Sequence, residues 1–143
     1  MKIRCKQGYI AVYSKGLINL ISKFKGLDGV KASAFFPLII FKDKSFEVDR
    51  IVIHERIHFK QQIELLFIGA IVWRFTERFY LKAFQSKNSL DSYKLTSFEQ
   101  EAYLNQENPN YLKERKAFAF VKYIKSKTNF EFDTSEPAKI KQL

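Results

Sequence analysis

The chain contains two histidines, and they stand four residues apart in the segment His54-Glu55-Arg56-Ile57-His58. Four residues make about one turn of an α-helix, so both imidazoles would project from one face and converge on a single metal ion. Glu55 would then lie beside the metal, where a carboxylate deprotonates a zinc-bound water. The spacing predicts a zinc-dependent hydrolytic site with Glu55 as the catalytic residue.

Chance is a poor explanation of this motif. Two histidines placed at random fall four apart in roughly one such chain in 70, and a glutamate follows the first of them in about one case in fourteen. The alternative is a histidine pair that is solvated, or satisfied in the core, on an ordinary helix. Val52, Ile53 and Ile57 argue against it, because they would bury that turn among apolar groups, where unpaired imidazoles are costly.

A catalytic zinc ordinarily has three protein ligands and a water, so a third ligand is needed. No further histidine is present, and the single cysteine, Cys5, stands far from the pair in the sequence. A carboxylate is therefore the expected donor, and Glu99 and Glu101 both lie on a predicted helix downstream. Helical geometry turns these two side chains about 200° apart, so only one of them can face the metal.

The pattern His54-Glu55-x-x-His58, followed downstream by Glu99-x-x-Ala102, resembles the zinc metallopeptidases of the gluzincin type, which comprise the thermolysin-like group and small single-domain relatives. The resemblance implies that His54, His58 and Glu99 bind Zn²⁺. It implies that Glu55 is the general base for the hydrolysis of a peptide bond. It also implies a zincin-like fold.

In this family an aspartate usually follows the glutamate ligand by one turn and orients a histidine ligand through its free ring nitrogen. This chain has Tyr103 at that position. A phenol accepts a hydrogen bond from an imidazole N–H without supplying a negative charge, so the resemblance gives Tyr103 the orienting role. Glu101 remains the alternative ligand to Glu99.

The elements expected around these residues are mostly helices. From about residue 49 to residue 67 the chain lacks Gly and Pro and places apolar residues at helical spacing, which predicts the helix that carries the histidine pair. A strand is expected before it, so the elements predict an α+β fold in which a short sheet packs on the metal-binding helix. Further helices are expected over residues 15–27, about 70–84, 98–105 and 111–127, with a loop at 85–92.

The apolar run Ala34–Phe41 is predicted as one strand, and Pro37 within it favours an edge position because proline cannot donate a ladder hydrogen bond. Peptidases of the resembled class hold an extended substrate against the exposed edge of a sheet. The resemblance therefore assigns substrate binding to this strand, through Phe36, Leu38 and Ile40. A mostly buried strand without a role in binding is the alternative.

Other polar residues near the motif have alternative roles. Gln61 follows the second histidine closely, and Gln62 either faces the cleft or solvates the helix. No Ser/His/Asp triad or Cys/His pair can be assembled, because both histidines belong to the metal motif. The group that would stabilise the oxyanion is left open among Tyr80, Tyr93, Tyr103 and Arg115.

Length and composition favour one domain over residues 1–143, and a loose polar tail is expected from about residue 130. The 25 Lys and Arg against 15 Asp and Glu give a formal charge of +10, and residues 1–27 contain no acidic residue. Such a charge attracts anionic partners, but no nucleic-acid reader motif is present, so no specific nucleic-acid partner is predicted. The single cysteine excludes a disulfide scaffold and indicates the cytoplasm.

A basic amphipathic helix is expected near the N-terminus, with an apolar stripe formed by Leu17, Leu20, Ile21, Phe24 and Leu27. We expect this stripe to dock on the core, with peripheral binding to the inner face of an anionic membrane as the alternative. The most apolar run, Leu65–Trp73, has nine residues, whereas a membrane span needs about 20.

Two hypotheses of function follow from these patterns. The first is a small zinc metallopeptidase that acts on a peptide or protein substrate. The second is a non-catalytic basic module that binds a membrane surface or a partner protein and keeps a structural or vestigial metal site.

Overall fold

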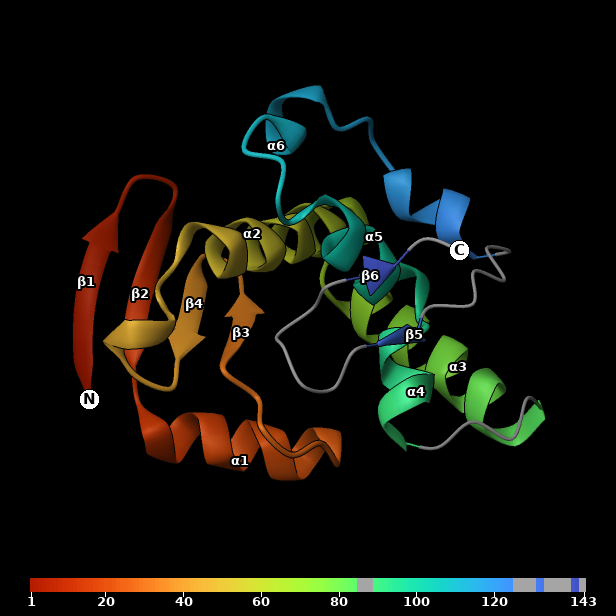
Figure 1. Cartoon of the computed structure of the whole chain (residues 1–143), viewed down its shortest axis with the longest axis horizontal. Helices are drawn as coiled ribbons and strands as arrows, with labels where there is room; N and C mark the ends of the chain where they lie inside the picture. Colours follow the sequence, from red (N-terminus) through yellow and green to blue (C-terminus); the bar gives the residue numbers. More distant parts are fainter. Residues whose placement is uncertain (85–88, 125–130, 133–139, 142–143) are drawn as a thin grey trace.

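The computed structural model describes residues 1–84, 89–124, 131–132 and 140–141 (Figure 1). Within these ranges the chain forms six α-helices, a four-stranded mixed sheet and a short ladder of two further strands. The α+β class expected from the sequence is confirmed.

The N-terminal residues form an antiparallel hairpin of β1 (Lys2–Lys6) and β2 (Tyr9–Tyr13). Gly8 allows the turn because its φ of 88° lies in the left-handed region that glycine adopts without strain. None of the predicted elements covers this hairpin, although charged and apolar residues alternate along β1. That alternation has the period of a strand with one face exposed.

Residues 34–41 form a hairpin rather than one strand. β3 (Ala32–Phe35) and β4 (Leu38–Phe41) pair antiparallel, and Phe36 and Pro37 make the turn between them. The prediction of a single edge strand is therefore wrong, because Pro37 sits in a turn, where it has no ladder bond to donate.

The order of strands in the sheet is β1-β2-β4-β3, with β4 parallel to β2. Leu38 and Ile40, which were expected at the edge, lie on the inner strand β4. Residues 32–35 of β3 form the edge instead.

The main apolar core lies between the sheet and α2 (Asp49–Glu64), which packs against β3. Side chains from three strands meet Phe59 of α2 there. The buried residues that the strands contribute to this core are Ala11, Ala32, Ala34, Ile39 and Phe41.

Helix α1 (Lys15–Lys25) packs against β3 and β4 and ends at Gly26, whose φ is 60°. The expectation that its apolar stripe docks on the core is only partly correct. Leu27 is buried and Ile21 is half-buried, but the other three members of the stripe, Leu17, Leu20 and Phe24, are exposed. Ile18 is the residue of α1 that enters the core.

Helix α2 ends near the position that the sequence predicts. Leu66 and Phe67 have positive φ values of 52° and 60°, which turn the chain sharply into α3 (Ile68–Phe84). The next helices are α4 (Ser89–Lys94) and α5 (Ser97–Asn105). The predicted loop at 85–92 thus overlaps α4, while residues 85–88 lie outside the described part of the chain.

The helix predicted over residues 111–127 is interrupted. α6 (Tyr111–Glu114) is followed by extended backbone at Arg115 and then by a 3-10 helix, η2 (Ala119–Tyr123). The break lets Arg115 reach Glu64 and Glu101, and a positive φ at Phe118 turns Phe120 into a second core cluster with Phe98.

Residues 125–127 of that predicted helix lie outside the described residues. Within the predicted polar tail, the two-residue strands β5 (Glu131–Phe132) and β6 (Ile140–Lys141) pair antiparallel. The remainder of the tail lies outside the description.

The break at Arg115 predicts different roles for two neighbouring phenylalanines. Phe120 is 2% exposed and Phe118 is 48% exposed. We expect Phe120→Ala to lower the free energy of unfolding by about 3 to 5 kcal/mol, because it leaves a cavity in the core. Phe118→Ala should cost less than about 1 kcal/mol. Urea unfolding measures both, and equal losses would contradict the observed backbone path.

Candidate metal centre

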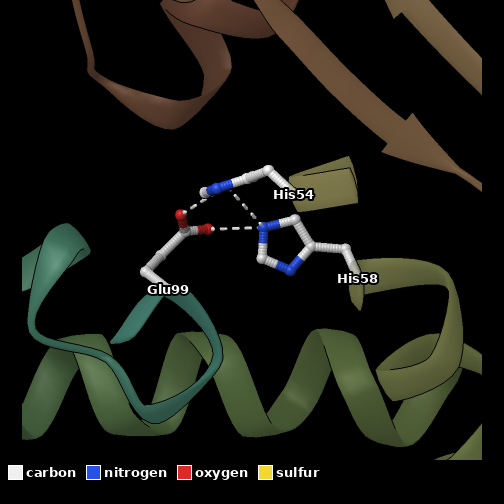
Figure 2. A group of neighbouring side chains, drawn as sticks. All are labelled: His54, His58 and Glu99. Carbon is white, nitrogen blue, oxygen red and sulfur yellow. Dashed lines mark hydrogen bonds and ion pairs between the residues drawn. The ribbon is translucent and has the colours of Figure 1, made fainter. Parts of the chain in front are cut away.

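Two histidines of α2 and one glutamate of α5 meet in the interior (Figure 2). The Nε2 atoms of His54 and His58 are 3.2 Å apart. Glu99 places Oε2 at 3.3 Å from Nε2 of His54 and Oε1 at 3.2 Å from Nε2 of His58. All three side chains are buried. The structure thus brings together the three residues that the sequence analysis names as metal ligands.

Helix α5 is held in place by polar and apolar contacts with α3 and η2. The indole of Trp73 donates to the hydroxyl of Ser97 (3.2 Å), and that hydroxyl donates to Glu77 (2.8 Å). One residue further along, the ring of Phe98 packs edge-on against Phe120 with centroids 4.8 Å apart. These contacts fix the first turn of α5, from which Glu99 extends.

The amide of Gln61 fixes the protonation of His58. Its Nε2 donates to the carbonyl of Phe98 (3.2 Å) and to the carboxylate of Glu101 (2.9 Å), and both of these groups can only accept. The amide oxygen must therefore face Nδ1 of His58, at 2.7 Å. Nδ1 carries the proton, so the lone pair of Nε2 points toward Glu99.

The other histidine, His54, also has a glutamine amide next to its Nδ1. Nδ1 of His54 lies 3.1 Å from the amide oxygen of Gln106. Tyr103, to which the resemblance gives the role of orienting an imidazole, packs its ring against that of His54 with centroids 4.7 Å apart. Gln61 and Gln106 are thus the residues next to the Nδ1 atoms of His58 and His54, the ring nitrogens that point away from Glu99. Sequence reasoning missed their role, because an amide on a helix carries no distinctive spacing.

At the centre of the cluster, Nε2 of His58 and the carboxylate oxygens of Glu99 are hydrogen-bond acceptors. In the described part of the chain, Oε2 of Glu99 has no hydrogen-bond partner although it is buried. Acceptors this close repel one another unless a cation lies near them. Arg74 supplies one positive charge, through Oε1 of Glu99, and Oε2 is left for a metal ion. Two imidazole nitrogens and one carboxylate oxygen are a donor set that suits Zn²⁺, and other divalent first-row metals as well. The residues present therefore fit a metal ion.

The pKa shifts of Glu99 and His58 agree with this chemistry, and that of His54 opposes it. Burial raises the pKa of Glu99, but His58 and Arg74 outweigh it and hold that pKa well below its usual value. Burial lowers the pKa of His58. The charge of Glu99 raises this pKa and the charge of Arg74 lowers it, and the net shift is downward. Burial also disfavours protonated His54, but its contact with Glu99 and the charge of Glu99 outweigh burial and raise its pKa, so His54 must release a proton before it binds a metal. An ionised Glu99 and a neutral His58 are the forms that bind a metal.

Arg74 is a site residue that the sequence analysis did not identify. It reaches in from α3, and its Nη2 donates to Oε1 of Glu99 and lies 3.3 Å from Nε2 of His58. The guanidinium lies over the rings of Phe98 and Tyr93, at 5.7 and 5.8 Å from their centroids. The one available signal was a charged residue that follows directly on the apolar run 65–73.

Glu101, the alternative ligand, is engaged elsewhere. Its fully buried carboxylate binds Arg115 and accepts a hydrogen bond from Tyr111 (3.0 Å). Arg115 also binds Glu64, and its side chain is 2% exposed. Among the described residues, the group able to hold a metal contains Glu99 and not Glu101.

The candidates for the oxyanion-stabilising group are separated by these contacts. Arg115 is committed to its two carboxylates and is unavailable. Tyr80 is 53% exposed and packs against Phe84 on α3. Tyr93 lies beside the site, because the guanidinium of Arg74 is 5.8 Å from its ring centroid, and burial and the charge of Glu99 raise its pKa. Arg74, which also donates to Glu99, and the tyrosines Tyr93 and Tyr103 are therefore the donors near the cluster.

Glu55 is buried beside the cluster. Its charge acts on His54, Arg74 and Lys25, which places it close to all three. Within the described ranges its carboxylate makes no hydrogen bond or ion pair. No other group in the described ranges thus occupies this carboxylate.

Gln62 occupies the edge of the sheet. Its amide accepts from the N–H of Phe36 (2.9 Å) and donates to the carbonyl of Ala34 (3.1 Å). In an antiparallel ladder, residues whose backbone groups face the partner strand alternate with residues whose backbone groups face away. Lys31 accepts a hydrogen bond from Lys42 and therefore faces β4, so the backbone groups of Ala34 and Phe36 face away from β4. The amide therefore takes two of the positions at which an added strand would pair.

Comparisons with known proteins add no relative. Scans of the chain against protein-family models, curated proteins and solved structures each find no match. What the site can do is therefore judged from its own chemistry and geometry.

The role of Gln61 predicts a loss of metal affinity on its removal. We expect the protein to bind about one Zn²⁺ per chain, and Gln61→Met to weaken this binding by about 10-fold to 100-fold, because methionine fills the space but cannot orient His58. Gln62→Met, one position along the same helix, should change the affinity by less than about twofold. Competition with a chromophoric chelator measures the affinities, with circular dichroism as the check on folding. Equal affinities of the two variants would contradict the role of Gln61.

Proposed function

We propose that this protein is a zinc-dependent metallopeptidase with a zincin-like arrangement of its helices and sheet. The observation that carries the proposal is the buried cluster of His54, His58 and Glu99, in which Oε2 of Glu99 has no hydrogen-bond partner among the described residues, next to the buried Glu55. Zn²⁺ held by these three residues supplies a Lewis acid and makes a water nucleophilic near neutral pH.

Glu55 acts as the general base and then as the general acid. Its carboxylate takes the proton from the attacking water and delivers it to the nitrogen of the leaving amine. Glu55 is suited to this because it is buried beside the ligands and, in the described chain, has no other hydrogen-bond partner.

Arg74 and Tyr93 stabilise the negative charge that develops on the carbonyl oxygen of the scissile bond. A guanidinium and a phenol donate hydrogen bonds that gain strength in a buried site. Arg74 already donates to Glu99 at the cluster, and its contact with the ring of Tyr93 holds the two donors together.

The substrate is an extended peptide that binds along β3 rather than along Leu38 and Ile40. β3 packs against the helix that carries the histidines, so a strand added there passes close to the cluster. Gln62 pairs with part of this edge, so the peptide either displaces its amide or pairs with the remaining backbone groups.

A second candidate function is a non-catalytic binding module, and Arg74 is the observation that favours it. A guanidinium that donates to Glu99 beside His58 already supplies positive charge to the cluster. A buried ionic network of this kind can stabilise a fold without turnover. The two functions differ in their need for Glu55.

Replacement of Glu55 separates the two functions. We expect Glu55→Gln to keep bound zinc but to lower peptide hydrolysis by about 10² to 10⁴-fold, because the amide keeps the shape of the side chain and cannot accept a proton. Glu107→Gln, at an exposed residue paired with Arg50, is the matched control and should keep full activity. Elemental analysis and cleavage of a fluorogenic peptide library are the measurements.

Two results would contradict the proposal. Unchanged turnover in Glu55→Gln would remove the assigned mechanism. Zinc binding by the wild-type protein without cleavage of any peptide in the library would support the binding module instead.

A further inference from the structure

One face of α3 is apolar and exposed to solvent. It consists of residues three or four apart, which lie within an arc of about 100° around the helix. Their exposed fractions run from 49% for Ile71 to 75% for Ile68. We call this surface the α3 outer face, formed by Ile68, Ile71, Val72, Phe75 and Phe79.

The opposite face of α3 is fixed to the rest of the protein. Trp73 and Glu77 bond to Ser97, Arg74 binds Glu99, and Ala70 and Leu81 are buried. The helix therefore cannot rotate to bury its outer face without breaking the contacts that hold α5. Exposed apolar surface of this extent on a soluble protein usually marks a binding surface.

The chain continues this exposed apolar surface at the start of α3. Leu66, in the turn that leads into the helix, is 81% exposed, and Phe67 beside it is 41% exposed. A helix that presents an apolar face to solvent while the protein holds its other face can lie in a membrane interface. None of the helices in the described ranges is long and apolar enough to cross a bilayer.

The charges around these faces suit an anionic surface. The only acidic residue of α3, Glu77, is on the fixed face, while Lys82 is exposed. α1 contains no acidic residue and exposes Lys15 and Lys23 beside its apolar residues. The whole chain carries a formal charge of +10.

Helices α1 and α3 are joined directly. The guanidinium of Arg78 on α3 donates to the carbonyl of Lys25 at the end of α1 (2.6 Å). Figure 1 shows both helices in the lower part of the view, with the sheet above α1. Near this junction, Phe24 of α1 is 88% exposed.

We propose that the α3 outer face docks on the surface of an anionic lipid bilayer. The apolar side chains enter the interface, and the lysines of α1 and α3 neutralise lipid headgroups. The candidate metal centre contacts the opposite face of the same helix through Arg74, so docking leaves the centre on the side of α3 away from the lipid. The docking surface does not depend on the proposed peptidase activity.

Cosedimentation of the full chain with lipid vesicles tests this proposal. We expect binding to vesicles of phosphatidylcholine with phosphatidylserine, and at least about tenfold weaker binding to phosphatidylcholine alone. Raising the salt from about 20 mM to about 150 mM should weaken binding to the anionic vesicles severalfold. The double variant Phe75→Asn/Phe79→Asn should lose at least about tenfold in affinity.

Ile3→Asn is the matched control, because Ile3 is 58% exposed on the basic strand β1, away from α3. It should bind vesicles like the wild type. Circular dichroism and zinc content check that every variant is folded.

Three results would overturn the proposal: no binding at low salt, equal binding to vesicles with and without phosphatidylserine, or equal losses in the control and the double variant. A dimer in sedimentation velocity that the double variant dissociates, with no vesicle binding, would assign the face to a second copy of the chain.

Discussion

The orientation of one amide, that of Gln61, decides what the interior of this protein can bind. Arg115 neutralises Glu101, Glu101 and the carbonyl of Phe98 accept from the amide nitrogen, and the amide oxygen then faces Nδ1 of His58. With the proton on Nδ1, the lone pair of Nε2 points inward, where it meets a second imidazole and a carboxylate. Each of these contacts restricts the next, and the last arrangement suits a cation, a need that the guanidinium of Arg74 meets in part.

Much of the remaining fold follows from the need to hold that chain of contacts in place. The C-terminal segment leaves the helical path at Arg115 because the guanidinium must reach Glu64 and Glu101 in the interior. Helix α3 commits one face to α5 and to the site, through Ser97 and Glu99. Its other face is consequently exposed, although it is apolar. The candidate centre and the proposed membrane surface are thus two consequences of how one helix is oriented.

The sequence predicts those parts that depend on local spacing. Four residues between His54 and His58 place both imidazoles on one helical face, and a carboxylate downstream completes the group, although Glu99 was distinguished from Glu101 by resemblance more than by geometry. Local spacing in the sequence does not show which segments that are distant in the chain come into contact. Arg74 and Gln106 join the site through packing of helices, and the strand expected over residues 34–41 is a hairpin because Pro37 forms its turn. The alternation along β1 was a local signal for the N-terminal hairpin.

The most direct test of the central claim is the protonation of the two imidazoles in zinc-loaded protein. Long-range ¹H–¹⁵N correlation spectra of histidine side chains report which ring nitrogen carries hydrogen and which binds the metal. The chain of contacts through Gln61 predicts hydrogen on Nδ1 of His58, with the Nε2 resonances of both histidines shifted by zinc. Hydrogen on Nε2 of His58, or spectra that zinc leaves unchanged, would contradict it.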